Sequence, residues 1–157
     1  MLTTTEHMTQ LQLRHYSDRL LTKLDARDQA LGEMKPAGLW CSVGRAWEDW
    51  CRTEEFHLDG LQHVHEIVMR HEANLLHLRG TRAIDEFNAR YGQSHSSIAL
   101  IDWPRVASNY GGIIIDPYCW ERRLTYLWYY SWDCASACIW DTGQVAEWRL
   151  IDAEVTR

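Results

Sequence analysis

A tryptophan-rich stretch, residues 35–51, constrains the fold of this chain more than any other part of the sequence. The short apolar run at residues 39–43, which follows Pro36 and Gly38, predicts a β-strand because turn residues bound it on both sides. The spacing of the next aromatic residues predicts a helix over residues 45–56. Two interpretations follow: the aromatic side chains form core, or they wall a slot for a flat, partly polar ligand. The side chains concerned are Trp40, Trp47 and Trp50.

The length of 157 residues predicts one domain, residues 1–157. Nine Trp and seven Tyr against two Phe is an unusual aromatic content, and it suits half-buried cleft walls because indole and phenol rings carry a polar group. The net charge of −6 lacks the basic footprint of a non-specific nucleic-acid binder.

The sequence also bears on where such a protein works. It contains no run of about 18 apolar residues, so we expect no membrane span. The polar first ten residues lack the apolar core of a secretion signal, which favours a cytoplasmic protein. The five cysteines form no C-x-x-C pair, so we expect reduced thiols.

Hydrophobic periodicity and turn residues predict an α+β fold with a mixed, mostly antiparallel sheet and helices. Strands are expected at residues 11–16, 39–43, 61–69, 74–78, 113–115, 124–132 and 138–140, with a strand or helical turn at 145–151. Helices are expected from Ser17-Asp18 through Leu20, Leu21 and Leu24, over 45–56, over 81–91 with Thr81 as its cap, and in a short turn at Pro104.

Three kinds of site are disfavoured by the motifs. His63 and His65 share one strand face, but no nearby Cys completes a zinc set, so we expect no metal site. Cys134 sits among small residues, and no nucleophile elbow accompanies it. The Gly111-Gly112 pair precedes a strand rather than a helix, unlike the phosphate-binding loop of a Rossmann fold.

Two short motifs together resemble a known family. His15-Tyr16-Ser17 ends the first predicted strand, and Gly38-Leu39-Trp40-Cys41-Ser42 forms the next one, before a helix that carries Trp50 and Cys51. In this order the chain resembles mono- and poly-ADP-ribosyltransferases of the H-Y-E type, and is similar to poly(ADP-ribose) polymerase catalytic domains. The resemblance implies an ADP-ribosyltransferase-like fold, with NAD as cofactor and a macromolecular acceptor, protein or nucleic acid.

The resemblance also implies roles for individual residues. His15 bonds a ribose hydroxyl of NAD, the backbone at Tyr16 holds the nicotinamide amide, and Ser42 anchors that amide. Trp40 and Trp50 sandwich the nicotinamide ring, in line with the attraction of a flat cation to indole faces. Ser17, Gly38 and Trp47 complete the expected cofactor-binding set.

The third family motif departs from the pattern. Gly occupies the position before the apolar strand at residues 113–115 where the family has its catalytic Glu. Asp116, Glu121 and Asp133 are the candidate replacements, and Asp133 is favoured because aromatic neighbours would desolvate it in part. His15 and Asp133 are therefore the predicted catalytic pair.

Two functions remain open on the sequence. One is an NAD-dependent ADP-ribosyltransferase that modifies a macromolecule. The other is a catalytically inactive module on the same fold that binds a nucleotide or a partner, such as a phage or bacterial accessory interaction protein. The Gly in place of Glu favours the second function.

Overall fold

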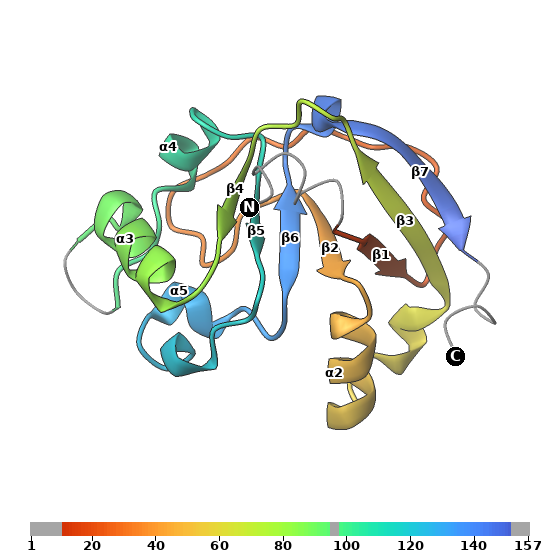
Figure 1. Ribbon diagram of the computed structural model, residues 1–157, viewed down its shortest axis with the longest axis horizontal. Coiled ribbons are helices and arrows are strands. Elements are labelled where there is room, and N and C mark those ends of the chain that lie inside the picture. Colours follow the sequence, from red (N-terminus) through yellow and green to blue (C-terminus); the bar gives the residue numbers. More distant parts are fainter. Residues whose placement is uncertain (1–10, 95–97, 152–157) are drawn as a thin grey trace, which may run out of the picture.

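Seven strands form one sheet in the order β4-β5-β6-β2-β1-β3-β7, in a computed structural model that describes residues 11–94 and 98–151 (Figure 1). Neighbouring strands are antiparallel except β4 and β5, which run parallel. The mixed, mostly antiparallel α+β architecture predicted from the sequence is confirmed. The strands are β1 (Leu13–Ser17), β2 (Leu39–Val43), β3 (His63–Met69), β4 (Leu75–Leu78), β5 (Gly112–Ile115), β6 (Ser136–Ile139) and β7 (Val145–Ile151).

The helices divide unevenly between the two halves of the sheet. Three of them gather beside β4 and β5, whereas α2 lies alone at the end of β2 (Figure 1). They are α2 (Ala46–Glu54), α3 (Thr81–Tyr91), α4 (Trp103–Ala107) and α5 (Leu127–Tyr130), with 3₁₀ turns η1 (Leu58–Leu61), η2 (Trp120–Arg122) and η3 (Thr142–Gln144). The turn from β2 into α2 passes through Gly44 at φ +57°, a conformation that favours glycine.

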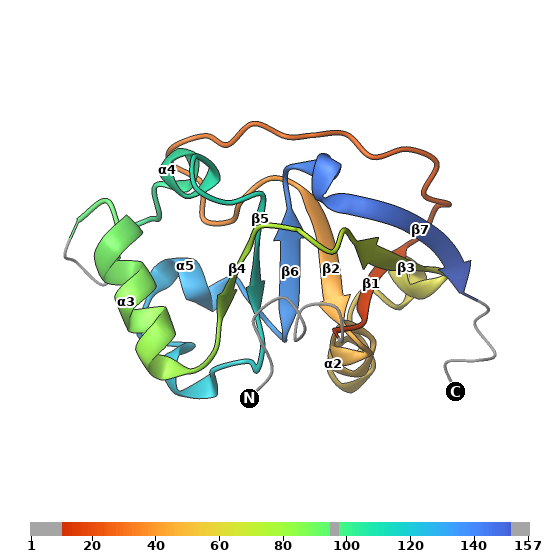
Figure 2. The same ribbon diagram turned by 45° about the horizontal axis from the view of Figure 1, so that its top comes forward.

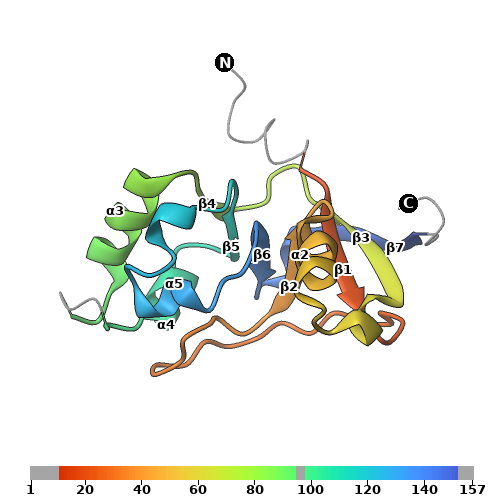
Figure 3. The same ribbon diagram turned by 90° about the horizontal axis from the view of Figure 1, so that it is seen from below.

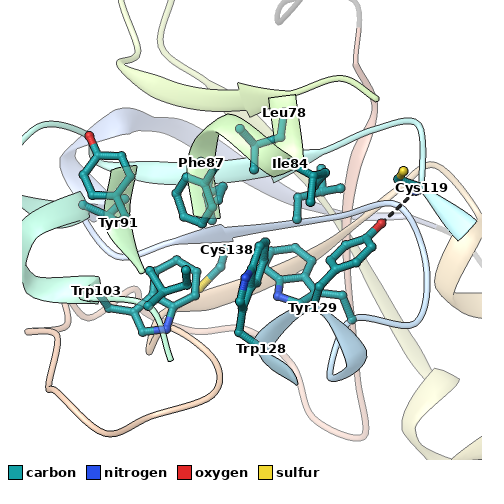
Figure 4. Packing of buried hydrophobic residues seen from close by; sticks show 14 of the residues in the cluster. Leu78, Ile84, Phe87, Tyr91, Trp103, Cys119, Trp128, Tyr129 and Cys138 are labelled. Carbon is teal, nitrogen blue, oxygen red and sulfur yellow. Dashed lines mark hydrogen bonds between the residues drawn. The ribbon is translucent and has the colours of Figure 1, made fainter. Parts of the chain in front are cut away.

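Strand β5 lies between two hydrophobic clusters, one on each face of the sheet. Ile113 and Ile115 belong to a cluster rich in aromatic residues, and Ile114 belongs to an aliphatic one. Because successive side chains alternate between faces, a strand covered on both sides reads as a continuous apolar run. In the aromatic cluster the rings of Phe87 and Trp128 pack edge to face, with centroids 5.2 Å apart (Figure 4).

An extended segment, residues 18–37, covers part of the aliphatic cluster. Figures 2 and 3 show it as the long orange chain between the β7 end and the α4 end of the molecule. The helix predicted to begin at Ser17-Asp18 is therefore wrong. Leu21 and Leu24 do pack against the aliphatic cluster, but Leu20 is exposed.

Tertiary hydrogen bonds explain why this segment stays extended. The Leu21 N–H donates to Nε2 of His65 at 3.3 Å, and its carbonyl accepts from Nε1 of Trp148 at 3.0 Å. Further along, the Arg27 N–H donates to the Trp140 carbonyl at 3.0 Å. Backbone groups bonded to other elements cannot also form a helix ladder, and an isolated short helix is only marginally stable.

The aromatic strand predicted at residues 124–132 is also wrong, because its centre forms helix α5. Trp128 and Tyr129 are adjacent and both fully buried in the same cluster. A strand would point them to opposite faces, whereas a helical turn lets both reach one core.

Other predicted elements agree with the structure apart from their ends. Strand β6 begins at Ser136, two residues before its predicted start at 138, and Leu61 belongs to η1 rather than to β3. Helix α3 begins and ends where predicted, but its N-cap is Gly80, and no side-chain cap bond forms. Helix α4, predicted as a short turn at Pro104, has Pro104 in its first turn and buries Trp103 and Val106.

Candidate functional site

The candidate site lies where strands β1 and β2 part. β1 pairs with β3 along all five of its residues, whereas its ladder with β2 has two pairs and ends at Arg14 and Ser42. Beyond that point Nδ1 of His15 lies 2.7 Å from the carbonyl oxygen of Trp40. A backbone carbonyl without a strand partner needs another donor. His15 supplies that donor and holds the two strands at a fixed separation.

A cavity of about 290 Å³ opens beside this gap. That volume is close to the lower end of the range for small-molecule sites, roughly 300–1,000 Å³. Its walls come from β1, from β2 and the start of α2, from Lys35, and from residues 131–136 after α5. Segments far apart in sequence therefore converge on one hollow.

Six of the nine predicted site residues line this cavity, although the sequence placed them in three separate segments. Five belong to the predicted cofactor-binding set, and the sixth is the predicted catalytic carboxylate. They are His15, Tyr16, Trp40, Ser42, Trp47 and Asp133.

Ser17 and Gly38, which are not among the lining residues, have evident structural roles. The Ser17 hydroxyl accepts a hydrogen bond from the Arg19 N–H at 3.0 Å in an exposed turn. A Cβ on Gly38 would lie 2.6 Å from the carbonyl oxygen of Ile139, so Gly lets β2 approach β6 closely. Neither residue is placed to touch a ligand in the cavity.

The predicted sandwich of Trp40 and Trp50 is wrong. Trp50 is absent from the lining and stacks on Trp47 instead, with ring centroids 5.4 Å apart and planes 8° apart. Trp40 packs edge to face against Trp132 at 4.8 Å, and Nζ of Lys35 lies 5.2 Å from its ring centroid. Trp40 and Trp47 are therefore the half-buried tryptophans of the cavity wall, which also includes Tyr16 and the core residue Trp132.

The Ser42 hydroxyl forms its hydrogen bonds within the turn that precedes α2. Its hydroxyl donates to the Gly44 carbonyl at 3.0 Å and accepts from the Trp47 N–H at 2.9 Å. A hydroxyl has one proton to donate. Ser42 thus fixes the position of Trp47 and has no second proton for a ligand carbonyl.

The two basic side chains that set the charge of the cavity were not among the residues predicted from the sequence. Arg14 and Lys35 line it, and Arg14 Nη1 and the Tyr16 hydroxyl are buried without a hydrogen-bond partner among the described residues. Burial raises the pKa of Tyr16, while the neighbouring Arg14 lowers it in part. The alternation of strand 11–16 was a usable signal, because it places Arg14 and Tyr16 on one face.

A third polar group in the lining belongs to a core residue. Trp132 is 1% exposed, and its Nε1 has no hydrogen-bond partner among residues 11–94 and 98–151. Buried N–H groups are normally paired. The indole N–H of Trp132 is therefore, like Arg14 Nη1 and the Tyr16 hydroxyl, a buried unpaired group in the cavity wall.

Asp133 reaches the cavity, but its charge is already balanced. Nη2 of Arg123 lies 3.1 Å from its Oδ1, and both side chains are 23% exposed. The same guanidinium donates to the Tyr118 hydroxyl at 2.8 Å and to the Trp132 carbonyl at 3.0 Å. Asp133 is thereby fixed in place, and the remaining lining charges, Arg14 and Lys35, are positive.

Cys134 also lines the cavity without being an activated nucleophile. Burial raises its pKa to about 11, and its Sγ lies 3.4 Å from the Ser136 hydroxyl. Since the thiolate is the reactive form of Cys, this thiol stays protonated near neutral pH. The cavity therefore lacks the low thiol pKa that a Cys hydrolase needs.

The Gly pair at the place of the family Glu lies away from the cavity. Gly112 is opposite Ile139 in the β5–β6 ladder, whereas the lining residue Ser136 is opposite Ile115 at the other end. A Cβ on Gly112 would also lie 2.7 Å from the Cys138 carbonyl. A carboxylate at this position would neither fit nor reach the site, and Asp116 and Glu121 are not in its lining.

Within residues 11–94 and 98–151, no three His, Cys, Asp or Glu side chains are grouped to hold a metal ion. In the same part of the chain no helix is long and apolar enough to cross a membrane. Comparison with protein-family models, curated proteins and solved structures finds no match to this chain.

Proposed function

We propose that this chain binds an NAD-type nucleotide in the cavity between β1, β2 and α2, and that it works as a binding module. The observation that carries the proposal is the convergence of five predicted NAD-binding residues on one hollow. Chance placement of the His-Tyr and Gly-x-Trp-x-Ser motifs would not require them to share a cavity wall.

The aromatic walls suit the flat base of such a ligand. Trp40 and Trp47 are half-buried, so each keeps surface on which a planar ring can stack. Lys35 already lies over the Trp40 ring, in the manner of a cation attracted to an indole face. A nicotinamide ring on that face displaces Lys35 towards the anionic part of the ligand.

The polar groups suit the ribose and phosphate. His15 uses Nδ1 for the Trp40 carbonyl, which leaves Nε2 for a ribose hydroxyl. Arg14 and Lys35 supply positive charge, and hydrogen bonds from charged donors to phosphate are about twice as strong as neutral ones. The cavity volume of about 290 Å³ fits one nucleotide half of NAD better than the whole dinucleotide.

ADP-ribosyl transfer to a macromolecular acceptor is the second candidate. The presence of Asp133 in the lining favours it, since a carboxylate there can stabilise positive charge that develops on the ribose. The Arg123 contact weakens that role, because the guanidinium already offsets the charge. Binding without turnover is therefore the better-supported function.

The test is a titration of the full chain with NAD, nicotinamide mononucleotide and AMP, followed by tryptophan fluorescence and calorimetry. We expect saturable binding, weakened about tenfold or more in Arg14→Gln, since a charge-assisted hydrogen bond contributes about 1.5–3 kcal/mol. Arg82→Gln is the matched control, because Arg82 is exposed on α3 and pairs with Glu86. Wild-type protein that shows no saturable response to any of the three ligands would refute the proposal.

Mass spectrometry of the NAD mixture then separates the two functions. Binding alone predicts intact NAD, whereas transferase activity predicts free nicotinamide that disappears in His15→Ala and Asp133→Ala. Nicotinamide release by the wild type that both variants lose would replace the binding module with the transferase.

A further inference from the structure

Strand β7 is the exposed edge of the sheet. It is last in the strand order, and no strand pairs with its outer side among the described residues (Figure 1). Five consecutive residues, 146–150, are exposed, including Trp148 at 36% and Leu150 at 57%. An exposed edge strand is a template for pairing with another chain, and proteins usually blunt such edges with Pro, Lys or bulged backbone. β7 contains neither Pro nor Lys. Its bulge, at Ala146 between the pairs Val68–Glu147 and Met69–Val145, leaves residues 147–151 in regular register.

The opposite edge of the sheet is different. Strand β4 has four residues and ends in buried Leu75 and Leu78, and α3 follows it closely in the chain. β7 has seven residues, of which only Val145 is buried. Of the two edge strands, β7 is therefore the one that is long and exposed enough to pair with another strand.

The sequence of β7 is self-complementary in an antiparallel arrangement. It reads Val-Ala-Glu-Trp-Arg-Leu-Ile, with Trp148 at the centre. If two copies pair about Trp148, Glu147 of one lies opposite Arg149 of the other, and the same contact repeats by symmetry. Opposite charges and aromatic pairs directly across two strands each stabilise a sheet.

We propose that β7 pairs with β7 of a second copy of this chain, in an antiparallel two-fold dimer centred on Trp148. The dimer joins two seven-stranded sheets into one continuous sheet. A two-fold interface uses the same patch on both copies, and β7 meets that requirement through its own charge pattern.

Contacts within the chain prepare the charged groups for this pairing. Nε of Arg149 lies 3.1 Å from Oε2 of Glu66, and its Nη1 lies 3.8 Å from Oε1 of Glu147. The first contact holds the guanidinium on the sheet surface, and the second is long. The bond from Trp148 Nε1 to the Leu21 carbonyl holds the central ring in place. The edge is therefore pre-organised in the monomer.

A second copy fits this edge better than an unrelated peptide does. An arbitrary strand can supply backbone hydrogen bonds, but it does not place Arg opposite Glu147, Glu opposite Arg149 and Trp opposite Trp148. Pairing confined to one strand from each copy buries less than a standard interface of about 1,600 Å². We therefore expect a dimer of micromolar strength.

The test uses two charge-reversed variants of the full chain, Glu147→Arg and Arg149→Glu, in analytical ultracentrifugation over a micromolar concentration series. Wild type should form a dimer. Each variant alone places like charges opposite each other twice, so its dissociation constant should rise about tenfold or more. An equimolar mixture should regain association as a 1:1 heterodimer, because every cross-strand pair is again of opposite charge.

Three outcomes would overturn the proposal: a wild type that stays monomeric, single variants that dimerise as strongly as wild type, or a mixture that does not associate. Hydrogen exchange gives an independent reading that a change in folding would not mimic. Among residues 146–150, the amides that point away from β3 should be protected in a concentration-dependent way in wild type and not in either single variant.

Discussion

Two groups of tryptophans in this molecule occupy opposite environments. Trp103 and Trp128 are fully buried, and their rings pack edge to face at 6.2 Å in the aromatic cluster (Figure 4). Trp40 and Trp47 are half-buried and line a cavity. In the first group every ring face meets another side chain, whereas the second group keeps ring surface towards a hollow.

This difference in burial separates the contribution of tryptophan to folding stability from its contribution to ligand binding. A fully enclosed indole contributes most through the apolar area removed from water, about 25 cal/mol per Å². A half-enclosed indole contributes less to folding and keeps area in reserve for a ligand. The stability of the fold should therefore depend on the first group and ligand binding on the second.

The largest expected effect separates these two groups directly. Trp128→Ala should lower the free energy of unfolding by about 3–5 kcal/mol, because it leaves a cavity in the core and removes the bond from its Nε1 to Asn88. Trp47→Ala should cost less than half as much. Urea unfolding followed by circular dichroism measures both. Equal losses would mean that the cavity tryptophans are core residues after all.

The next effect concerns the backbone that carries Trp40. Gly38→Ala should destabilise the fold by about 1–3 kcal/mol, because the new methyl group would overlap the Ile139 carbonyl and Sγ of Cys138. The carbonyl belongs to β6 and cannot move without disturbing the sheet. Gly60→Ala is the control, since no atom lies within 4 Å of its added Cβ. If both changes have the same effect in thermal unfolding, β2 does not need the close approach that positions Trp40.

Local sequence signals predicted much of the fold. The bounding turn residues and the aromatic spacing predicted β2 and α2, and the helix predicted over residues 81–91 has the bounds of α3. The signals failed where tertiary contacts decide. Leu20, Leu21 and Leu24 have helical spacing, yet backbone bonds to His65, Trp148 and Trp140 keep that segment extended.

The candidate site was predictable in membership and not in detail. The motifs identified His15, Tyr16, Trp40 and Ser42 as neighbours, and all four line the cavity. The hydrogen-bond and ion-pair partners of the site residues could not be predicted, because these partners lie on loops that are distant in the sequence. Arg123, which neutralises Asp133, lies in a region that the sequence described only as irregular and aromatic.

The smallest expected effect tests a single atom of the cavity wall. Tyr16→Phe removes a buried hydroxyl that has no hydrogen-bond partner among the described residues. An unpaired buried polar group is costly, so the free energy of unfolding should stay the same or rise by about 1 kcal/mol. Affinity for the nucleotide should fall about five- to tenfold, because a hydrogen bond to the ligand is lost.

These opposite signs distinguish a ligand-binding group from a structural one. A hydroxyl retained for stability would give a less stable protein with unchanged affinity, and that result would remove Tyr16 from the proposed site. Tyr129→Phe provides the structural reference, because the Tyr129 hydroxyl accepts the Cys119 N–H at 2.7 Å inside the core. Its loss should lower stability and leave binding unaffected. The two variants thus compare a hydroxyl in the cavity wall with a hydroxyl in the core, as the tryptophan variants compare half-buried rings with fully buried ones.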